Sequence, residues 1–549
     1  MAPDTSSSGI ITSMQSPAAR RLLHAPRVVS SWFHWATGRL ERHPGALYVL
    51  CSVAVLTIIL LIASSPVLPA GILPLLGICL LVSLLLGSLC LYIWTLQPKS
   101  MRQPKSLFLL ASVILLTVAI TRSFFFFLPS AHQALPHVPA SALEYSIPVA
   151  LGGLLLALLF NSRLAFAGAL AISILTSLVA ADGFRFFLYS LVSSLAAIFA
   201  LVGQKDRATL LKAGAAVGLA NLYSILAWSL LSGTTEWLGF HLLCGLAGGL
   251  FVAILSLGLL PLFEYLFEVA TDFRLLELCN LNHPLLKEMI LKAPGTYHHS
   301  VVVGTLAEAA AEAIGANALL CRVGAYYHDI GKITKPSYFV ENQQNVRSRH
   351  EKLGPSLSSL VIVSHVKGGI ELGRAYGLPQ TVLEMIPQHH GTRLILFFYH
   401  KAKGTEESDQ GEVQEEKFRY PGPKPQTKEA AILMLADAVE AASRTLTERT
   451  PGRFQALVAK IVNAIFADGQ LRECELTFSE LRLIEENFIR ILSGIYHRRV
   501  EYPGFAFEES AGRRGANGTA GHKSTKEDQA RHEISKKGRA DYPRHSRGS

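Results

Sequence analysis

The sequence predicts an all-α protein in two parts, a polytopic helical membrane domain followed by an all-helical soluble domain. Half of the 549 residues are hydrophobic and the mean hydropathy is +0.32, which is too apolar for a purely soluble chain. The stretch from Leu47 to Phe267 is almost uninterrupted apolar sequence. After Pro261, almost every segment repeats its apolar residues with helical period, and strand patterns are absent.

The membrane domain is predicted to contain about eight spans. A span normally needs about 20 apolar residues. Eight segments reach or approach that length: Leu47–Ser64, Ile72–Trp94, Leu107–Leu128, Pro148–Phe160, Leu164–Ala180, Phe186–Val202, Leu211–Leu231 and Phe240–Phe267. The fourth and fifth segments are short and only three residues separate them, so the count of eight depends most on these two segments.

The distribution of basic residues predicts the orientation in the membrane. Lys and Arg precede the first span and fill the second and sixth connections, whereas Pro66–Gly71, Pro129–Tyr145 and Ser232–Trp237 carry neither. By the positive-inside rule, both termini and the soluble domain are expected to be cytoplasmic. The connections on the other side are too short to fold a sensor domain, and the longest, Pro129–Tyr145, is expected to be only a loop.

These features divide the chain into four parts. We expect a basic cytoplasmic N-terminal segment (1–45), a transmembrane helical domain (46–268), a cytoplasmic catalytic domain (269–510) and a disordered basic tail (511–549). The formal net charge is +10, but many of the basic residues lie in the first and last of these parts, outside any predicted fold. We therefore expect the lipid bilayer as a partner and no nucleic-acid polymer.

Two acidic residues of the soluble domain, Asp329 and Asp437, are candidate metal ligands. His328 and Asp329 end the predicted helix Ala318–His328, and adjacent helical residues point about 100° apart, so the pair could reach two metals or chelate one. Gly331 is predicted to stop this helix, and Lys332 can reach an anionic oxygen. Asp437 falls within a largely apolar helix, where its burial is costly unless it is paired or metal-bound. For Asp437, a structural salt bridge is the alternative.

Histidines supply the other candidate ligands. His389 and His390 form a pair at a helix end, which could equally be a plain polar terminus. His365 lies in an apolar helix, where a satisfied core histidine is the ordinary interpretation. His299 is preferred to His298, because it directly precedes Ser300 at the entry of the helix predicted for Val301–Ile314.

The order His, His-Asp, His, His-His, Asp resembles the HD-domain metal-dependent phosphohydrolases, and in particular the membrane-bound seven-transmembrane HD family, whose members hydrolyse cyclic di-AMP to the linear dinucleotide. The resemblance covers roughly Pro261 to Pro503. It is carried by Leu275-Leu276-Glu277-Leu278, Asn282-His283-Pro284-Leu285-Leu286, Ala293-Pro294-Gly295-Thr296-Tyr297-His298-His299-Ser300, Val323-Gly324-Ala325-Tyr326-Tyr327, Phe339-Val340-Glu341-Asn342-Gln343, Tyr420-Pro421-Gly422-Pro423-Lys424-Pro425, Ala436-Asp437-Ala438-Val439-Glu440-Ala441-Ala442-Ser443-Arg444 and Asp468-Gly469-Gln470-Leu471.

The resemblance implies a site with two divalent metal ions, iron or manganese, and no thiolate ligand. It implies two ligand sets that share a bridging Asp329: His299, His328, Asp329 and Asp437 for one metal, and Asp329, His365, His389 and His390 for the other. Lys332 and Arg444 are candidates for neutralising the phosphate charge. The implied protein is a multi-pass phosphodiesterase of the bacterial inner (plasma) membrane with a cyclic dinucleotide as substrate; a homodimer stays open.

Two departures from the family pattern and two alternative functions stay open. Only Ser64–Gly71 separates the first two spans, where the family commonly carries a large extracellular sensor, and the usual Asn-x-His-Asp segment appears as Ser348-Arg349-His350-Glu351. The segment after His390 lacks the Gly-Tyr-Pro element of the cyclic di-GMP class. The alternatives are a phosphohydrolase acting on another nucleotide, and a membrane receptor whose HD domain binds a nucleotide without turning it over.

Overall fold

The computed structural model describes residues 44–69, 71–97, 104–202, 208–343, 348–404 and 413–496. Within these ranges the protein is helical, and the one β-bridge, between Leu394 and Arg419, belongs to no strand. The predicted all-α class is therefore confirmed for the described residues. Most of the predicted N-terminal segment and the whole predicted tail lie outside them.

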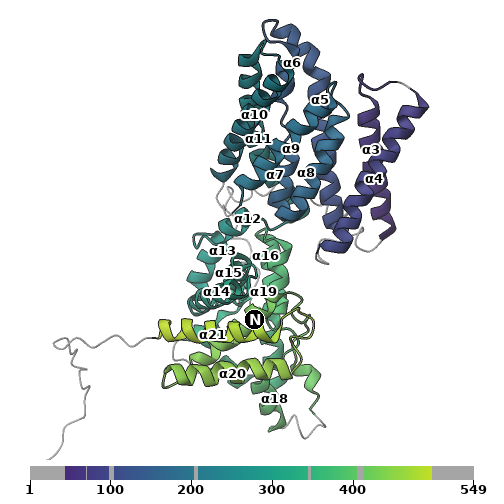
Figure 1. The fold of residues 1–549 in the computed structure, drawn as a ribbon. Helices are drawn as coiled ribbons and strands as arrows, with labels where there is room; N and C mark the ends of the chain where they lie inside the picture. The colour runs from purple at the N-terminus through teal and green to yellow at the C-terminus, as the bar shows by residue number, and fades with distance from the viewer. Residues whose placement is uncertain are drawn as a thin grey trace, which may run out of the picture. The chain divides into compact units, whose positions relative to one another are not determined.

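Each of the eight predicted spans contains a long or short apolar helix. The helices are α3 (Pro44–Ala63), α4 (Ile72–Leu96), α5 (Pro104–Ala134), α6 (Ala140–Leu143) with a 3-10 turn (Glu144–Ser146) leading to α7 (Leu151–Leu159), α8 (Ser162–Ser177), α9 (Gly183–Ala200), α10 (Ala208–Ser232) and α11 (Leu238–Phe267) (Figure 1). Six stretches of the described chain are long and apolar enough to cross a membrane, and Ser52–Ala63 and Ser162–Ser177 are shorter apolar helices. The count of about eight is consistent with these helices.

Helices α10 and α11 pack very closely because glycines face each other across them. A Cβ added at Gly249 would lie 2.5 Å from the carbonyl oxygen of Gly214 and 2.5 Å from the amide nitrogen of Gly218. Small residues of this kind let two backbones approach within a membrane bundle. Helix α11 then runs on to Phe267, directly before the soluble domain.

The expectation that Pro129–Tyr145 is only a loop is wrong. Helix α5 continues to Ala134, helix α6 follows at Ala140–Leu143, and Tyr145 is buried at 6% exposure in an apolar cluster with Phe186 and Tyr189. The sequence does not indicate these helices, because prolines such as Pro129 and Pro139 usually mark turns. In the structure Pro129 lies inside α5 and Pro139 is the N-cap of α6.

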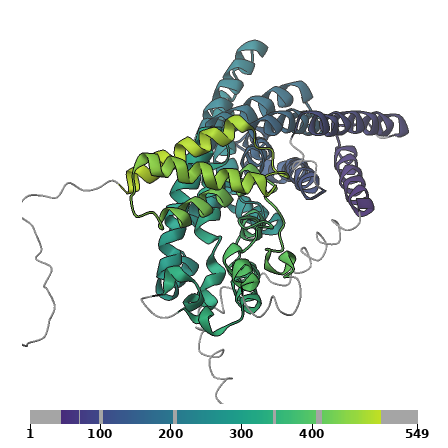
Figure 2. The same ribbon diagram turned by 90° about the horizontal axis from the view of Figure 1, so that it is seen from below.

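The soluble domain is a helical bundle in which α20 and α21 lie side by side (Figure 2). Its helices are α12 (Asp272–Leu278), α13 (Pro284–Lys292), α14 (Pro294–Ile314), α15 (Ala318–Tyr327), α16 (Pro355–Ala375), α17 (Gln380–Gln388), α18 (Leu396–Lys403), α19 (Lys428–Ser443), α20 (Pro451–Ala467) and α21 (Phe478–Ile495). Five 3-10 turns interrupt the connections: Ile330–Thr334, Pro336–Tyr338, Val340–Asn342, Arg349–Lys352 and Glu415–Phe418. One apolar cluster joins α14, α19, α20 and α21, and a second joins α12, α13, α15, α16 and α17.

Two local predictions in this domain are corrected. Helix α14 begins at Pro294, where proline suits the first helical turn, so His299 lies inside the helix rather than at its entry. Gly331 does not stop helix α15, which ends at Tyr327. A Cβ at Gly331 would lie 1.9 Å from the carbonyl oxygen of His365, so this glycine allows the turn after Asp329 to contact α16.

Candidate metal centre

Asp329 lies at the centre of a buried cluster of imidazoles. It lies two residues after the end of α15, and it is 1% exposed. Its Oδ2 lies 3.2 Å from His328 Nε2 and 3.7 Å from His299 Nε2, whereas its Oδ1 lies 3.4 Å from His365 Nε2 and 3.8 Å from His389 Nε2. The two carboxylate oxygens of Asp329 therefore face two different groups of histidines.

A second carboxylate, that of Asp437 on α19, closes the cluster from the other side. Asp437 Oδ1 lies 3.0 Å from His299 Nε2 and 3.7 Å from His328 Nε2, and its Oδ2 lies 4.0 Å from His390 Nδ1. Asp437 is 8% exposed. A carboxylate this deeply buried needs compensating partners, and imidazoles supply them here.

All seven predicted ligands come together from five elements of the chain. Their ligand atoms form two groups with the geometry of metal sites, one of Asp329, His365, His389 and His390 and the other of His299, His328 and Asp437, and within each group the atoms lie within 4.8 Å of one another. His298, by contrast, is exposed. This grouping matches the two ligand sets that the resemblance implies, with Asp329 contacting both.

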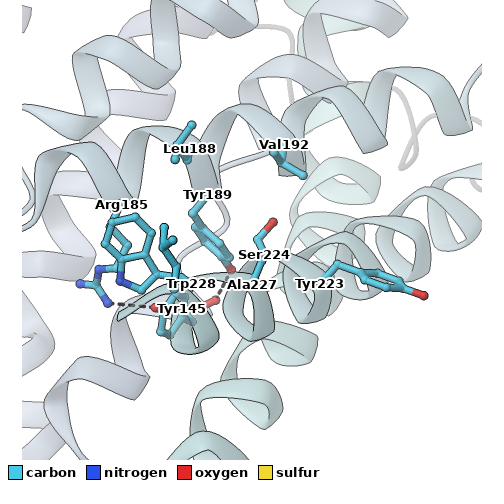
Figure 3. A pocket seen from close by; sticks show the side chains of 10 residues that line it. Tyr145, Arg185, Leu188, Tyr189, Val192, Tyr223, Ser224, Ala227 and Trp228 are labelled. Carbon is cyan, nitrogen blue, oxygen red and sulfur yellow. Dashed lines mark hydrogen bonds between the residues drawn. The ribbon is translucent and has the colours of Figure 1, made fainter. Parts of the chain in front are cut away.

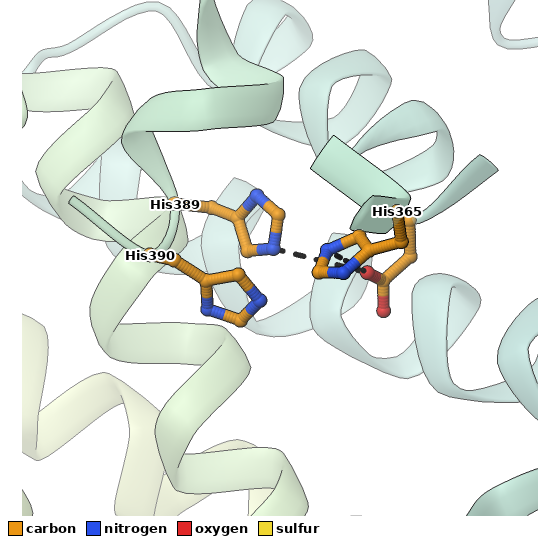
Figure 4. A group of neighbouring side chains, drawn as sticks. His365, His389 and His390 are labelled. Carbon is orange, nitrogen blue, oxygen red and sulfur yellow. Dashed lines mark ion pairs between the residues drawn. The ribbon is translucent and has the colours of Figure 1, made fainter. Parts of the chain in front are cut away.

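Hydrogen bonds to the backbone orient three of the histidines. The Nδ1 atoms of His328, His365 and His389 lie 2.7, 2.6 and 2.5 Å from the carbonyl oxygens of Ala325, Ile362 and Ile386. Since a carbonyl accepts only, each Nδ1 carries a proton, and the neutral form of each ring presents its Nε2 lone pair to the cluster. Figure 4 shows the rings of His365, His389 and His390 close to one another, and ion pairs join His365 and His389 to Asp329.

These inward-facing atoms fit a metal. The Nε2 atoms of His328, His365 and His389 and the Oδ1 atom of Asp329 are buried and have no hydrogen-bond partner in the described chain. Four orphaned acceptors at one point are rare in a folded protein, because each costs free energy. Divalent cations with an affinity for imidazole and carboxylate ligands would satisfy them.

The electrostatics agree with this interpretation. Burial lowers the pKa of His389 to about 3 and also lowers the pKa of His365 and His390, so these rings are neutral, as metal ligands must be. Burial alone would lower the pKa of His328 as well, but the carboxylates of Asp329 and Asp437 raise it to about 10. A divalent cation bound between these carboxylates would take the place of the proton on His328, and this ring would then be neutral like the other three.

Glu440 supports the site from behind and was missed at the sequence level. Its side chain is fully buried and its Oε2 lies 2.5 Å from His299 Nδ1, on the side of the ring away from the cluster. Its other oxygen accepts from Arg444 Nε at 2.7 Å. A carboxylate behind a ligand histidine fixes the tautomer and raises the basicity of the ring. The signal was present, because Glu440 lies three residues after Asp437 on the same helix.

The two basic residues singled out from the sequence occupy different positions. Lys332 Nζ lies 2.7 Å from Asp329 Oδ2 and 2.8 Å from Glu341 Oε1. These two carboxylates raise the pKa of Lys332 in spite of its burial, so it stays charged. Arg444 instead pairs with Glu440, with Arg444 Nη2 2.6 Å from Glu440 Oε1. The structure thus places Lys332 at the cluster and Arg444 one residue removed from it.

An aromatic ring lies against the open side of the cluster. Tyr420 stacks on His390 with ring centroids 4.0 Å apart and an interplanar angle of 23°. His390 is the one ligand of its group that is not fully buried. Tyr420 therefore covers the one partly exposed residue of this group. Sequence reasoning named Tyr420 only as part of a motif.

Comparisons with known proteins agree with this arrangement. A family model described as a 7TM receptor with intracellular HD hydrolase matches residues 72–271, and the HD domain model matches residues 296–442. The chain belongs to the 7TM-HD family. The HD model spans the helices that carry all seven clustered residues, and the 7TM model spans α4 to α11.

Two relatives of this chain are named for the same activity. The cyclic-di-AMP phosphodiesterase PgpH of Bacillus subtilis is 39% identical over 439 residues, which cover 78% of this chain and 60% of that protein. The protein of the same name from Listeria monocytogenes is 41% identical over 372 residues, 66% of this chain and 50% of that protein. The chain thus spans about half of the length of these relatives. The crystal structure of the Listeria monocytogenes PgpH HD domain in complex with cyclic-di-AMP is 49% identical, covering 40% of this chain and all of that one, with a TM-score of 0.38.

Proposed function

We propose that this 7TM-HD protein is a membrane-bound, metal-dependent phosphodiesterase that hydrolyses cyclic di-AMP to the linear dinucleotide. The observation that carries the proposal is the pair of buried His/Asp groups that meet at Asp329. The names of the two PgpH relatives support the choice of substrate. The basic connections on one side of the bundle support a cytoplasmic HD domain and cytoplasmic termini in the bacterial inner membrane.

The proposed metal content is two divalent cations, iron or manganese. His299, His328 and Asp437 would hold one, His365, His389 and His390 the other, and Asp329 would bridge both with its two oxygens. Bound there, the cations would lower the pKa of a water molecule and polarise the phosphodiester. Imidazole and carboxylate ligands without thiolates suit iron and manganese.

The remaining residues of the site position these groups and the substrate. Glu440 holds His299 in the tautomer that presents Nε2 to the cluster, and we propose that Arg444 acts through Glu440 instead of contacting a phosphate. Lys332 places its ammonium in contact with Asp329, so it is our candidate for neutralising charge on the phosphate. The ring of Tyr420 covers His390 and limits the approach to the cluster.

The full-length chain, purified in nanodiscs and loaded with Mn²⁺ or Fe²⁺, tests this function. It should convert cyclic di-AMP to the linear dinucleotide faster than it converts cyclic di-GMP, and mass spectrometry identifies the product. Faster turnover of another nucleotide would favour the alternative that the protein is a phosphohydrolase with a different substrate. Metal uptake and nucleotide binding without turnover of any substrate would favour the receptor hypothesis.

A further inference from the structure

Partners on several sides hold Arg185, the charged side chain among the described residues that line a cavity of about 350 Å³ in the membrane bundle (Figure 3). Its guanidinium pairs with Glu144, donates to Tyr145 Oη at 3.0 Å and lies 3.3 Å from Asp182 Oδ2. Most polar groups that are shielded from water in a folded protein are held by hydrogen bonds in this way. One residue of the metal cluster, His390, is not.

The imidazole of His390 has no hydrogen bond to fix its orientation. Hydrogen bonds of Nδ1 orient the other four histidines of the cluster, three of them on backbone carbonyls and His299 on Glu440. The His390 ring forms none with the described residues, and its Nδ1 lies 4.0 Å from Asp437 Oδ2, which is beyond hydrogen-bond distance. The torsion next to an imidazole ring has broad minima, so another contact is needed to set the angle of this ring.

Three aromatic rings lie against His390 instead. The ring centroids of His389, Tyr420 and His365 are 3.8, 4.0 and 5.2 Å from its own. His365 and His389 are ligands of the same group. Tyr420 is the ring of the three that is not a ligand, and it lies nearly parallel to His390, with an interplanar angle of 23°. Contacts between aromatic rings stabilise beyond the area that they bury, so Tyr420 can hold the imidazole in one plane.

The backbone of Tyr420 is tied to the segment that follows His390. Tyr420 N donates to the carbonyl oxygen of Arg393 at 3.0 Å, and the β-bridge between Leu394 and Arg419 lies next to this bond. The stack is therefore built on two short segments that pair with each other, and this pairing sets the position of Tyr420 relative to His390.

Thr392, which lies between His390 and this bridge, is held at both of its backbone groups. Its N–H donates to Gln470 Oε1 at 2.9 Å, and its carbonyl oxygen accepts from Arg419 Nη1 at 2.8 Å. Gln470 is fully buried. The chain between the ligand and the bridge is thus fixed as well, so the tyrosine ring has a firm support.

We propose that Tyr420 is a positioning residue of the metal centre, whose ring holds the imidazole of His390 in the orientation that completes its ligand group. The ring carries this role, because the hydroxyl of Tyr420 makes no hydrogen bond with the described residues. The proposal rests on the metal centre of the proposed function and deepens it, but it does not depend on which nucleotide is the substrate.

Titration of the full-length, metal-free chain with Mn²⁺ in nanodiscs tests this role without a substrate. Calorimetry measures the affinity for each ion, and electron paramagnetic resonance distinguishes a single bound Mn²⁺ from an exchange-coupled pair. Tyr420→Leu removes the aromatic ring and should weaken the binding of one of the two ions about ten-fold, so the signal of the coupled pair should appear only at higher Mn²⁺ concentrations. Tyr420→Phe keeps the ring and should keep the metal affinities of the wild type.

Two further comparisons separate this role from a general loosening of the fold. Tyr399→Leu makes the same change at a ring whose described ring contacts, with His400 and Phe418, include no ligand of the cluster, and it should leave both affinities unchanged. His390→Ala should weaken the same ion as Tyr420→Leu does. Combining the two changes should cause no further loss of affinity, because a residue that acts through His390 then has nothing left to orient.

Binding of both ions by Tyr420→Leu with the affinities of the wild type would overturn the proposal. So would an equal loss in Tyr420→Phe, equal weakening of both ions, or a further ten-fold loss when Tyr420→Leu is added to His390→Ala. A wild type that binds no Mn²⁺ would overturn the metal centre and this role with it. Two bound ions and the expected behaviour of the variants, but no turnover of cyclic di-AMP, would instead support the role of Tyr420 and contradict the proposed function.

Discussion

His299 and Glu440 are held together across the back of the metal cluster, with His299 Nδ1 2.5 Å from the fully buried carboxylate of Glu440. Because the carboxylate accepts from Nδ1, the other ring nitrogen is left to face Asp437, 3.0 Å away. This contact assigns the tautomer of a ligand that no backbone carbonyl orients. Glu440 thus belongs to the site together with the residues that face the cluster.

Replacing this carboxylate should weaken metal binding without removing any ligand. Glu440→Gln keeps the shape but loses the charge that makes His299 a better donor, and metal affinity should fall about 10- to 100-fold. Titration with Mn²⁺ monitored by isothermal calorimetry measures it. Glu448→Gln changes an acid that is 70% exposed and serves as the control. An affinity for Mn²⁺ equal to that of the wild type would refute the supporting role of Glu440.

The choice between two adjacent histidines has a direct test. Asp329→Ala should remove all bound metal, since both groups of ligands share this residue. His298→Ala should keep the metal content of the wild type, because His298 is exposed and contributes no atom to either group. Elemental analysis of the purified proteins measures both. Equal losses in the two variants would contradict the assignment of His299.

Arg444 and Lys332 should differ in how they affect turnover. Arg444→Gln loosens Glu440 and should lower metal affinity, so excess Mn²⁺ should restore kcat. Lys332→Ala leaves the partly buried Glu341 and the buried Asp329 without their shared cation, and its loss of kcat should persist at saturating metal, by about 10- to 100-fold. Steady-state kinetics at several Mn²⁺ concentrations separate the two. An Arg444→Gln defect that survives saturating metal would show that Arg444 contacts the substrate.

A glycine pair tests the close contact between the turn after Asp329 and helix α16. Gly331→Ala places a Cβ 1.9 Å from the carbonyl oxygen of His365, and it should destabilise the domain by about 3 kcal/mol. At Gly368, one turn further along α16, the same change meets no atom closer than 4.0 Å, so Ala should be neutral or stabilising there. Thermal unfolding of the two variants measures the difference. An unchanged Tm for Gly331→Ala would contradict the contact.

Much of the fold was predictable because its signals are local. The spans are apolar over long stretches, and the helices of the soluble domain repeat their apolar residues with period 3.6, which is set by their own sequence. Helix α14 starts about two turns earlier than predicted, since the polar run Gly295–His299 masks the helical pattern and only Pro294 indicates the start.

The clustered residues of the site could be predicted from the sequence, but the residues that hold them in place could not. The seven clustered residues could be named because their order along the chain resembles a family pattern. The role of Gly331 could not, because it depends on where α16 passes in three dimensions.

The hydrolysis of cyclic di-AMP by the Mn²⁺-loaded full-length chain, compared with its Asp329→Ala variant, tests the central claim most directly. The account predicts that the wild type releases the linear dinucleotide, that a chelator abolishes this turnover and added Mn²⁺ restores it, and that the folded variant shows none. A wild type that takes up metal, remains folded and leaves cyclic di-AMP intact would contradict the account, as would a metal-free Asp329→Ala variant that hydrolyses it at the rate of the wild type.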